Sequence, residues 1–196
     1  MDVCARVGRA PLDVVRAFLS AGVRLIQLRA KTWESGAFLD LAHATVAEAR
    51  PAGAVVVVND RADIAMLSGA QGLHVGQDDL TPTDARRVIG RASWVGLSTH
   101  TEAQWTAAFD EPVTYVAIGP VFGTETKATG YCAVGLETVG RVAAVARAMP
   151  VVAIGGITLD NAAAVIAAGA SSVAVISDLL AGSVEARARA FIAALA

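Results

Sequence analysis

The sequence has little of several features that would assign it to common classes of protein. Its 196 residues include only two cysteines, Cys4 and Cys132, which cannot form a disulfide framework and favour a reducing compartment. Lysine and arginine number 16 against 18 aspartates and glutamates, and this balance argues against general nucleic-acid binding. No run of about 20 residues is apolar and charge-free enough to span a bilayer, and the N-terminal residues lack the apolar run of a signal peptide. We therefore expect a cytoplasmic protein with no nucleic-acid and no membrane partner.

Hydrophobic residues are abundant instead, at 55% of the chain, whereas only 17% of the residues are charged. Disorder requires low hydrophobicity and high net charge, so this composition predicts a folded chain. The length fits one domain, since domains commonly have about 100–200 residues. No linker or low-complexity tract interrupts the sequence. We expect a single domain over residues 1–196.

Short β-branched runs alternate with longer amphipathic stretches. Apolar residues three or four positions apart predict helices between the runs. Near-continuous apolar strands that alternate with helices are typical of a parallel sheet buried on both faces. Seven strands are predicted: Val23–Gln27, Val55–Asn59, Leu73–Val75, Trp94–Ser98, Tyr115–Ile118, Val151–Ile154 and Val173–Ile176.

Two α/β architectures fit this order, a closed TIM (β/α)8 barrel and an open doubly wound sheet. No G-x-G-x-x-G follows a strand, so the dinucleotide-binding form of an open sheet is unsupported. Polar residues follow nearly every strand, and chemistry spread over many strand ends is typical of a TIM barrel. Residues 1–8 make a poor buried strand. We therefore favour a TIM barrel that lacks its first strand or forms it irregularly.

Three polar side chains follow the first predicted strand. Gln27, Arg29 and Lys31 alternate with apolar residues, so the two-residue period of a strand puts them on one side. An amide, a guanidinium and an ammonium group together can bind an oxyanion. A solvated strand end is the alternative interpretation.

Acidic residues follow the next two strands. Asn59 and Asp60 end one apolar run, and Asp79 lies shortly after the next. Mg²⁺ typically binds one or two carboxylates together with substrate phosphates and water, so Asp60 and Asp79 are predicted magnesium ligands. The alternative is that Asp60 caps the helix that begins near Arg61.

Histidine and serine residues near the strand ends carry weaker signals. His74 has no second histidine at ligand spacing, so we interpret it as a packed rim residue and do not expect a zinc site. Ser98 follows Gly96 and suits a close contact with a phosphate. No G-x-S-x-G surrounds Ser98, so it is not predicted to be a nucleophile.

The longest loop spans residues 119–130 and is rich in glycine, threonine and lysine. Thr124 and Thr126 offer hydroxyl groups, and Lys127 offers a mobile positive charge. Long loops in compact barrels are usually functional, and this composition predicts a lid over phosphate groups. An exposed loop of no consequence is the alternative.

Small residues follow the last two strands. Gly155 and Gly156 would let backbone N–H groups approach an anion, and Ser177 follows the seventh strand. The corresponding loops of TIM barrels commonly bind a phosphate. Together with the polar residues after the earlier strands, these residues predict two anion sites at one opening. One is suited to a diphosphate with Mg²⁺ and the other to a monophosphate ester. This arrangement predicts the joining of two phosphorylated small molecules with diphosphate as the leaving group.

The whole set of motifs resembles the thiamine-phosphate synthase family, in the right order over about residues 11–196. The similarity rests on Q-L-R-x-K at 27–31, N-D at 59–60, G-L-H-V-G-Q-D-D at 72–79, G-L-S-T-H at 96–100, G-P-V-F-G-T-E-T-K at 119–127, A-I-G-G-I at 153–157 and V-A-V-I-S at 173–177. The family's apolar opening strand has no counterpart here, and Asp178 stands where a small residue is common.

The resemblance implies a TIM barrel that couples hydroxymethylpyrimidine diphosphate to a thiazole phosphate. The residues implied to bind the diphosphate are Gln27, Arg29, Lys31 and Asn59, with Asp60 and Asp79 holding Mg²⁺. Ser98 and Lys127 are implied to hold departing diphosphate oxygens. The residues implied to position the thiazole phosphate are Thr124, Thr126, Gly156, Ile176 and Ser177.

The implied mechanism is dissociative: diphosphate leaves first, and the thiazole nitrogen attacks a pyrimidine carbocation. Arg29, Ser98 and Lys127 are then the catalytic residues, because such chemistry needs the leaving-group charge neutralised rather than a protein nucleophile. Two other functions are considered, a thiazole tautomerase and a catalytically impaired barrel that only binds phosphate ligands. The sequence does not fix the oligomeric state, and a homo-oligomer is compatible with it.

Overall fold

The computed structural model describes residue 4, residues 8–124 and residues 130–195. Seven parallel strands form one sheet in the order of the sequence. The strands are β1 (Leu25–Leu28), β2 (Val55–Asn59), β3 (Gly72–Val75), β4 (Trp94–Thr99), β5 (Tyr115–Ile118), β6 (Val151–Ile154) and β7 (Ser172–Ala174). All seven predicted strands are present, with β1 displaced toward the C-terminus and β7 shorter than predicted.

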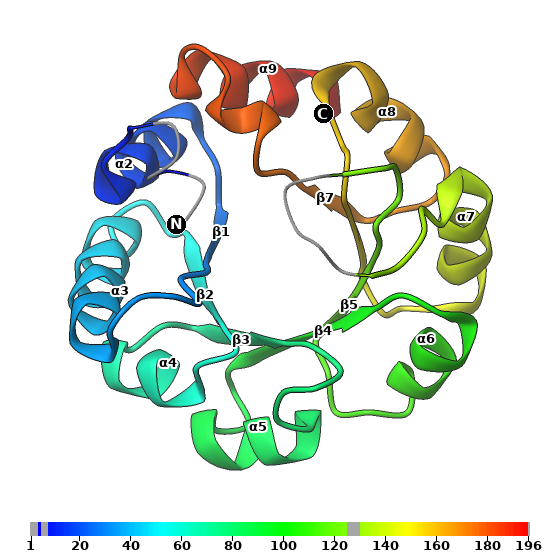
Figure 1. Ribbon diagram of the computed structural model, residues 1–196, viewed down its shortest axis with the longest axis horizontal. Coiled ribbons are helices and arrows are strands. Elements are labelled where there is room, and N and C mark those ends of the chain that lie inside the picture. Colours follow the sequence, from blue (N-terminus) through cyan, green and yellow to red (C-terminus); the bar gives the residue numbers. More distant parts are fainter. Residues whose placement is uncertain (1–3, 5–7, 125–129, 196) are drawn as a thin grey trace.

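A ring of helices surrounds the curled sheet (Figure 1). These helices are α2 (Pro11–Ala21), α3 (Ser35–Ala49), α4 (Ala62–Ser68), α5 (Pro82–Ile89), α6 (Glu102–Ala108), α7 (Gly135–Val145), α8 (Leu159–Ala167) and α9 (Val184–Leu195), with a short 3-10 helix η1 at Asp178–Leu180. In the described part of the chain, none of them is long and apolar enough to cross a membrane.

The sheet curls as in a TIM barrel but is not a closed eight-stranded one. Each strand pairs only with its neighbours in sequence, and within the described ranges no strand joins β1 to β7. The prediction of a TIM-like α/β fold is confirmed, but the described residues do not form a complete eight-stranded barrel. The qualification that the first strand is missing or irregular therefore agrees with the structure.

The main core lies between the sheet and the helices. Alternate strand residues such as Val58, Leu73, Val95 and Val116 are buried on this side. Because side chains alternate across a strand, the intervening residues face the inside of the curl. Asn59, His74, Gly96 and Tyr115 are aligned there by the pairing of β2 through β5.

A smaller core lies near β1 and β7, the two edges of the sheet among the described residues. Cys4, Val14, Leu180 and Val184 pack together and link α2, η1 and α9. The helix α2 begins with Pro11 at its first turn, where a missing N–H costs little, and ends at Gly22 in the left-handed conformation. These contacts hold α2 beside β1, so that β1 can present its polar residues at the end of the sheet.

Candidate active site

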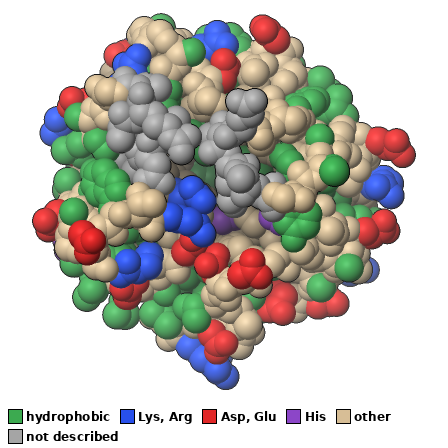
Figure 2. Space-filling view, viewed as in Figure 1, with side chains coloured by type: hydrophobic (Ala, Val, Ile, Leu, Met, Phe, Trp, Pro, Cys, Tyr) green, Lys and Arg blue, Asp and Glu red, His purple; other side chains and the backbone are tan. Residues whose placement is uncertain are grey.

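The carboxyl ends of the strands and their loops form one face of the molecule. Figure 2 views this face, and basic, acidic and histidine side chains gather near its centre. In barrels of this type the chemistry lies on this face, because the loops after the strands meet there. The polar residues predicted from the sequence come from these strand ends and loops.

Lys31, Asp60 and Asp79 form a charged cluster at the ends of β1, β2 and β3. The Nζ atom of Lys31 lies 2.7 Å from Oδ2 of Asp60. Asp79 is close enough to hydrogen-bond with Asp60, and its Oδ2 also accepts a hydrogen bond of 2.8 Å from the backbone N–H of Gly76. The structure therefore brings together the two predicted metal ligands and the predicted lysine.

Asp60 has an unusual backbone and an unfavourable environment for a charge. Its φ of 63° lies in the left-handed region, which is uncommon for residues other than glycine. Burial raises the pKa of its carboxyl group and the neighbouring Asp79 raises that pKa further, whereas Lys31 lowers it. The alternative that Asp60 caps a helix is wrong, since Arg61 is the N-cap residue of α4.

Two adjacent carboxylates fit a magnesium ion, which would relieve their mutual repulsion. Within the described residues, no group of three or more histidine, cysteine or acidic side chains forms a metal site. A Mg²⁺ ion held by Asp60 and Asp79 would thus take its remaining ligands from water and substrate phosphates, as is usual for this ion.

Gln27 and Arg29 lie on β1 and directly after it, and they line a pocket between β1 and β7. Ile154, Ala174, Val175 and Ile176 form part of its wall. The same four residues line a second pocket. The two pockets are therefore neighbours with a common wall, and the predicted diphosphate ligands on β1 lie next to the second pocket.

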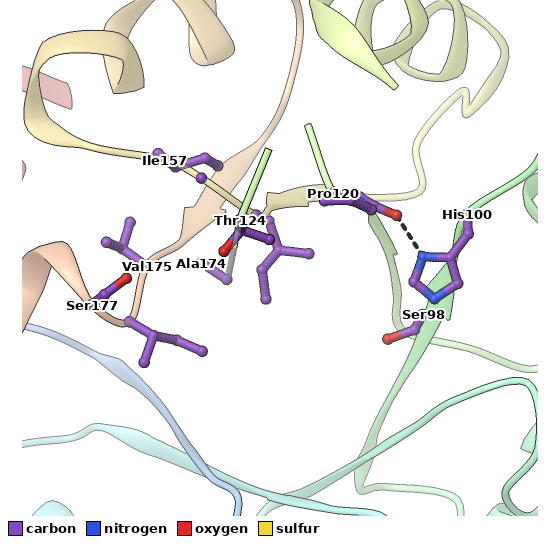
Figure 3. A pocket seen from close by; sticks show the side chains of 13 residues that line it. Ser98, His100, Pro120, Thr124, Ile157, Ala174, Val175 and Ser177 are labelled. Atoms are coloured by element: carbon purple, nitrogen blue, oxygen red, sulfur yellow. Dashed lines mark hydrogen bonds between the residues drawn. The ribbon is translucent and has the colours of Figure 1, made fainter. Parts of the chain in front are cut away.

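The second pocket brings together five residues predicted from the sequence (Figure 3). Ser98 and Ser177 lie on opposite sides of it with their hydroxyl groups directed inward. Thr124, Gly156 and Ile176 also line it, together with His100, Pro120 and Ile157. Hydroxyl and backbone donors on a largely apolar wall are suited to a small phosphorylated molecule.

The double glycine in this pocket is required by both backbone and packing. Gly155 and Gly156 have φ values of 100° and 64°. A Cβ on Gly155 would lie 2.5 Å from Cβ of Pro120, and one on Gly156 would lie 2.6 Å from the carbonyl oxygen of Gly123. The loop after β5 thus packs directly on the loop after β6, and the absence of side chains keeps the backbone accessible to an anion.

Asp178 follows Ser177, and its negative charge is compensated. Both of its oxygens accept hydrogen bonds from Nη2 of Arg187, at 2.7 and 2.8 Å. Its Oδ2 also accepts a hydrogen bond of 2.9 Å from the backbone N–H of Leu159, at the start of α8. The carboxylate is thus directed toward a helix N-terminus and an arginine, which reduces its repulsion of an anion near Ser177.

Sequence reasoning missed the polar group behind Ser98. His74 is buried, as the packed-residue interpretation requires, but its Nε2 lies 2.8 Å from Oγ of Ser98 and its Nδ1 lies 2.9 Å from the hydroxyl oxygen of Tyr115. Tyr115 was predicted only as part of a strand. The signal that identifies the pair is Gly96, which lies between them across the sheet.

Of the remaining predicted residues, one is described by the structure and two are not. Asn59 is buried at the end of β2, beside His74 in the sheet register. Thr126 and Lys127, the predicted lid residues, lie outside the described residues.

The chain is similar to known proteins of one family. Residues 3–179 match the family model described as thiamine monophosphate synthase. The chain is 42% identical to the thiamine-phosphate synthase of Roseiflexus sp. strain RS-1, over 96% of this chain and 80% of that protein. It is 44% identical to the Thermus thermophilus thiamine-phosphate synthase, over 87% of this chain and 82% of that protein. The solved thiamine phosphate pyrophosphorylase of Pyrococcus furiosus is 27% identical and superimposes with a TM-score of 0.89, covering 97% of this chain and 91% of that one.

Proposed function

Because the chain belongs to the thiamine monophosphate synthase family, we propose that it condenses hydroxymethylpyrimidine diphosphate with thiazole phosphate, giving thiamine phosphate and diphosphate. The observation that carries this proposal is that two differently built polar groups lie at the carboxyl ends of the strands. One is Lys31 beside the carboxylates of Asp60 and Asp79, and the other is the Gly156 backbone with Ser177 in the second pocket; we propose that each site binds one phosphorylated group. A condensation of two phosphorylated molecules needs both sites at once.

The charged side of the opening is suited to the diphosphate. Gln27, Arg29, Lys31 and Asn59 supply neutral and cationic donors, and Asp60 and Asp79 would hold Mg²⁺. Magnesium would neutralise charge on the diphosphate as it departs. Lys31 pairs with Asp60 in the free protein, so its ammonium group is already held beside the phosphate site.

Ser98 is proposed to act on the diphosphate from the wall of the second pocket. Its hydroxyl group lines the pocket of the thiazole phosphate and would donate a hydrogen bond to a diphosphate oxygen. Such a donor stabilises the transition state more than the substrate, because negative charge accumulates as the carbon–oxygen bond breaks. Lys127 is proposed to act on the same oxygens.

The second pocket, which contains Ser98 and Ser177, is suited to the acceptor. Gly156, Ile176 and Ser177 would hold the thiazole phosphate through backbone and hydroxyl donors, with Thr124 and Thr126 completing the site. The apolar wall of Ile154 and Ala174 would face the rings. Holding both substrates in reacting positions contributes on the order of 7–11 kcal/mol toward lowering the barrier. No protein nucleophile is needed.

The test is the release of diphosphate by the purified protein with both substrates, with and without Mg²⁺. We expect release that depends on both substrates and is lost on chelation of the metal. Metal-independent proton exchange on a thiazole phosphate without condensation would identify a tautomerase instead. Binding of the phosphorylated ligands without either reaction would identify an impaired barrel.

A further inference from the structure

Gly96 creates a gap in the inner surface of the sheet. The register places His74 on β3, Gly96 on β4 and Tyr115 on β5 side by side. A Cβ added to Gly96 would lie 2.1 Å from Cζ of Tyr115 and 2.5 Å from Nδ1 of His74. Real Cβ atoms do not approach other atoms so closely. The two rings meet across β4 only because the residue between them has no side chain.

The contact made over Gly96 is a buried hydrogen bond that continues to the opening. His74 and Tyr115 are each only 6% exposed, and their rings stack at an interplanar angle of 26°. Nδ1 of His74 lies 2.9 Å from the Tyr115 hydroxyl oxygen, and Nε2 lies 2.8 Å from Oγ of Ser98. Ser98 in turn lines the pocket. A buried tyrosine is thereby linked through both nitrogens of one imidazole to a hydroxyl at the active site.

The proton count limits these hydrogen bonds to two directions. Burial raises the pKa of Tyr115 far above its ordinary value, so the phenol keeps its one hydrogen. A hydrogen bond between the Gln27 side chain and the Tyr115 hydroxyl partly opposes that rise. In one direction Gln27 donates to Tyr115, Tyr115 to His74 and His74 to Ser98, and in the other direction every one of these bonds is reversed. In the first direction the Tyr115 hydrogen is donated to Nδ1 of His74. A neutral imidazole that accepts at Nδ1 carries its hydrogen on Nε2 and donates it to Ser98.

We propose that Gln27, Tyr115 and His74 form a positioning relay, which fixes His74 as the Nε2–H tautomer and directs the Ser98 hydrogen to an oxygen of the departing diphosphate. Ser98 accepts from His74, so its own hydrogen is available to an acceptor in the opening. The opposite arrangement would point a lone pair of Ser98 at an anion. The identity of that acceptor rests on the function proposed above, whereas the tautomer of His74 can be measured in the free protein without any substrate.

The relay moves no proton and needs no change of charge. His74 and Tyr115 are positioning residues, whereas the Ser98 hydroxyl would touch the leaving group. Loss of one donor to a developing negative charge typically lowers kcat about 100- to 1,000-fold, which is the expectation for Ser98→Ala. Loss of an orienting partner typically lowers activity about 10- to 100-fold, which is the expectation for Tyr115→Phe.

The first test is the tautomer of His74 in the free protein. Two-bond ¹H–¹⁵N spectra of ¹⁵N-histidine-labelled protein distinguish a protonated from an unprotonated ring nitrogen, and His74→Asn assigns the signals. We expect Nε2 protonated and Nδ1 unprotonated in the wild type. Tyr115→Phe removes the donor to Nδ1, so we expect its signals to move toward a mixture of tautomers.

Tyr131→Phe is the matched control. Tyr131 stacks on a different histidine, His100, with ring centroids 4.2 Å apart, so the same chemical change touches another imidazole. We expect it to leave the His74 signals and kcat unchanged. A merely structural role for Tyr115 would lower stability without changing the tautomer.

The second test is a kinetic comparison of the same variants. The relay predicts that Tyr115→Phe lowers kcat about 10- to 100-fold, with KM for the pyrimidine diphosphate changed less than about threefold. A wild-type His74 that is protonated on Nδ1, or an unchanged kcat in Tyr115→Phe, would overturn the relay. If the wild type releases no diphosphate while His74 is the Nε2–H tautomer, the proposed function fails and the hydrogen-bond direction stands. If Tyr115→Phe does not fold, the wild-type spectrum alone decides.

Discussion

Gly156→Ala separates the structural from the functional requirement for the double glycine. The substitution puts a side chain on a residue with φ of 64°, which costs roughly 1–2 kcal/mol for an L-residue. The new Cβ would also lie 2.6 Å from the carbonyl oxygen of Gly123 and 2.8 Å from Cβ of Phe122. Overpacking of this kind typically costs about 1–3 kcal/mol more. We therefore expect the free energy of unfolding to fall by about 2–5 kcal/mol.

Gly53→Ala provides the matched control. Gly53 has nearly the same φ, 65°, but no atom lies within 4 Å of the position of an added Cβ. This variant should lose only the backbone cost of about 1–2 kcal/mol. For a protein of this size 1 kcal/mol corresponds to about 2–4 °C in Tm, so Gly156→Ala should melt about 2–12 °C below Gly53→Ala.

The kinetic consequence of Gly156→Ala is separate from its effect on stability. Displacing the backbone removes one donor to the thiazole phosphate, and a hydrogen bond to a charged group contributes about 1.5–3 kcal/mol. KM for thiazole phosphate should therefore rise about 10- to 150-fold in Gly156→Ala and stay unchanged in Gly53→Ala. Denaturant titrations and initial rates measure both quantities. Equal stability and equal KM in the two variants would refute the close packing and the phosphate site.

Four further substitutions test the charged residues. Asp60→Asn should lower affinity for Mg²⁺ in activity titrations. The raised pKa of Asp60 means that its ionised form opposes folding, so its contribution to stability is lost as the pH rises above the ordinary aspartate pKa of about 4. Metal-free Asp60→Asn should therefore gain in Tm relative to the wild type as the pH rises from about 4, and a relative loss would contradict this. Arg187→Met should cost about 1–3 kcal/mol and raise KM for thiazole phosphate by exposing the Asp178 charge, and Asp178→Asn in the same chain should restore KM. Arg29→Ala should cut diphosphate release at least about 100-fold with an unchanged circular dichroism spectrum, and wild-type turnover would remove Arg29 from the mechanism.

The sequence was sufficient to predict the parallel strands and most strand-end residues. Period and spacing identify Val55–Asn59 as a buried strand, and topology then places Asp60 at the rim. The pairing of Asp60 with Lys31 was not predictable from spacing, because the two residues lie on different strand ends 29 positions apart. Its helix-capping alternative failed because a left-handed φ at Asp60 puts Arg61 at the N-cap.

The polar group behind Ser98 required the register of three strands. His74, Gly96 and Tyr115 are far apart in the sequence, and a shift of one residue in any strand would separate them. A lone histidine in an apolar run was therefore interpreted only as a packed residue. Closure of the barrel also depends on pairing between strands that are far apart in the sequence. The sequence therefore indicated an irregular or missing first strand, but it did not show whether the edges at β1 and β7 are joined.

Side chains of β4 point alternately to the inside of the curl and to the helices, so the position of each residue along the strand decides whether it reaches the site. Gly96 and Ser98 face the inside of the curl, whereas Val95 and Leu97 pack toward the helices. Inserting one residue before Gly96 would exchange these two sets. Ser98 would then point into the hydrophobic core between sheet and helices, and Leu97 would point toward the opening. Each strand could still be formed from good strand residues, yet the hydroxyl would no longer reach either substrate. An insertion scan of this strand would thus find loss of turnover at single-residue steps and partial recovery at two-residue steps.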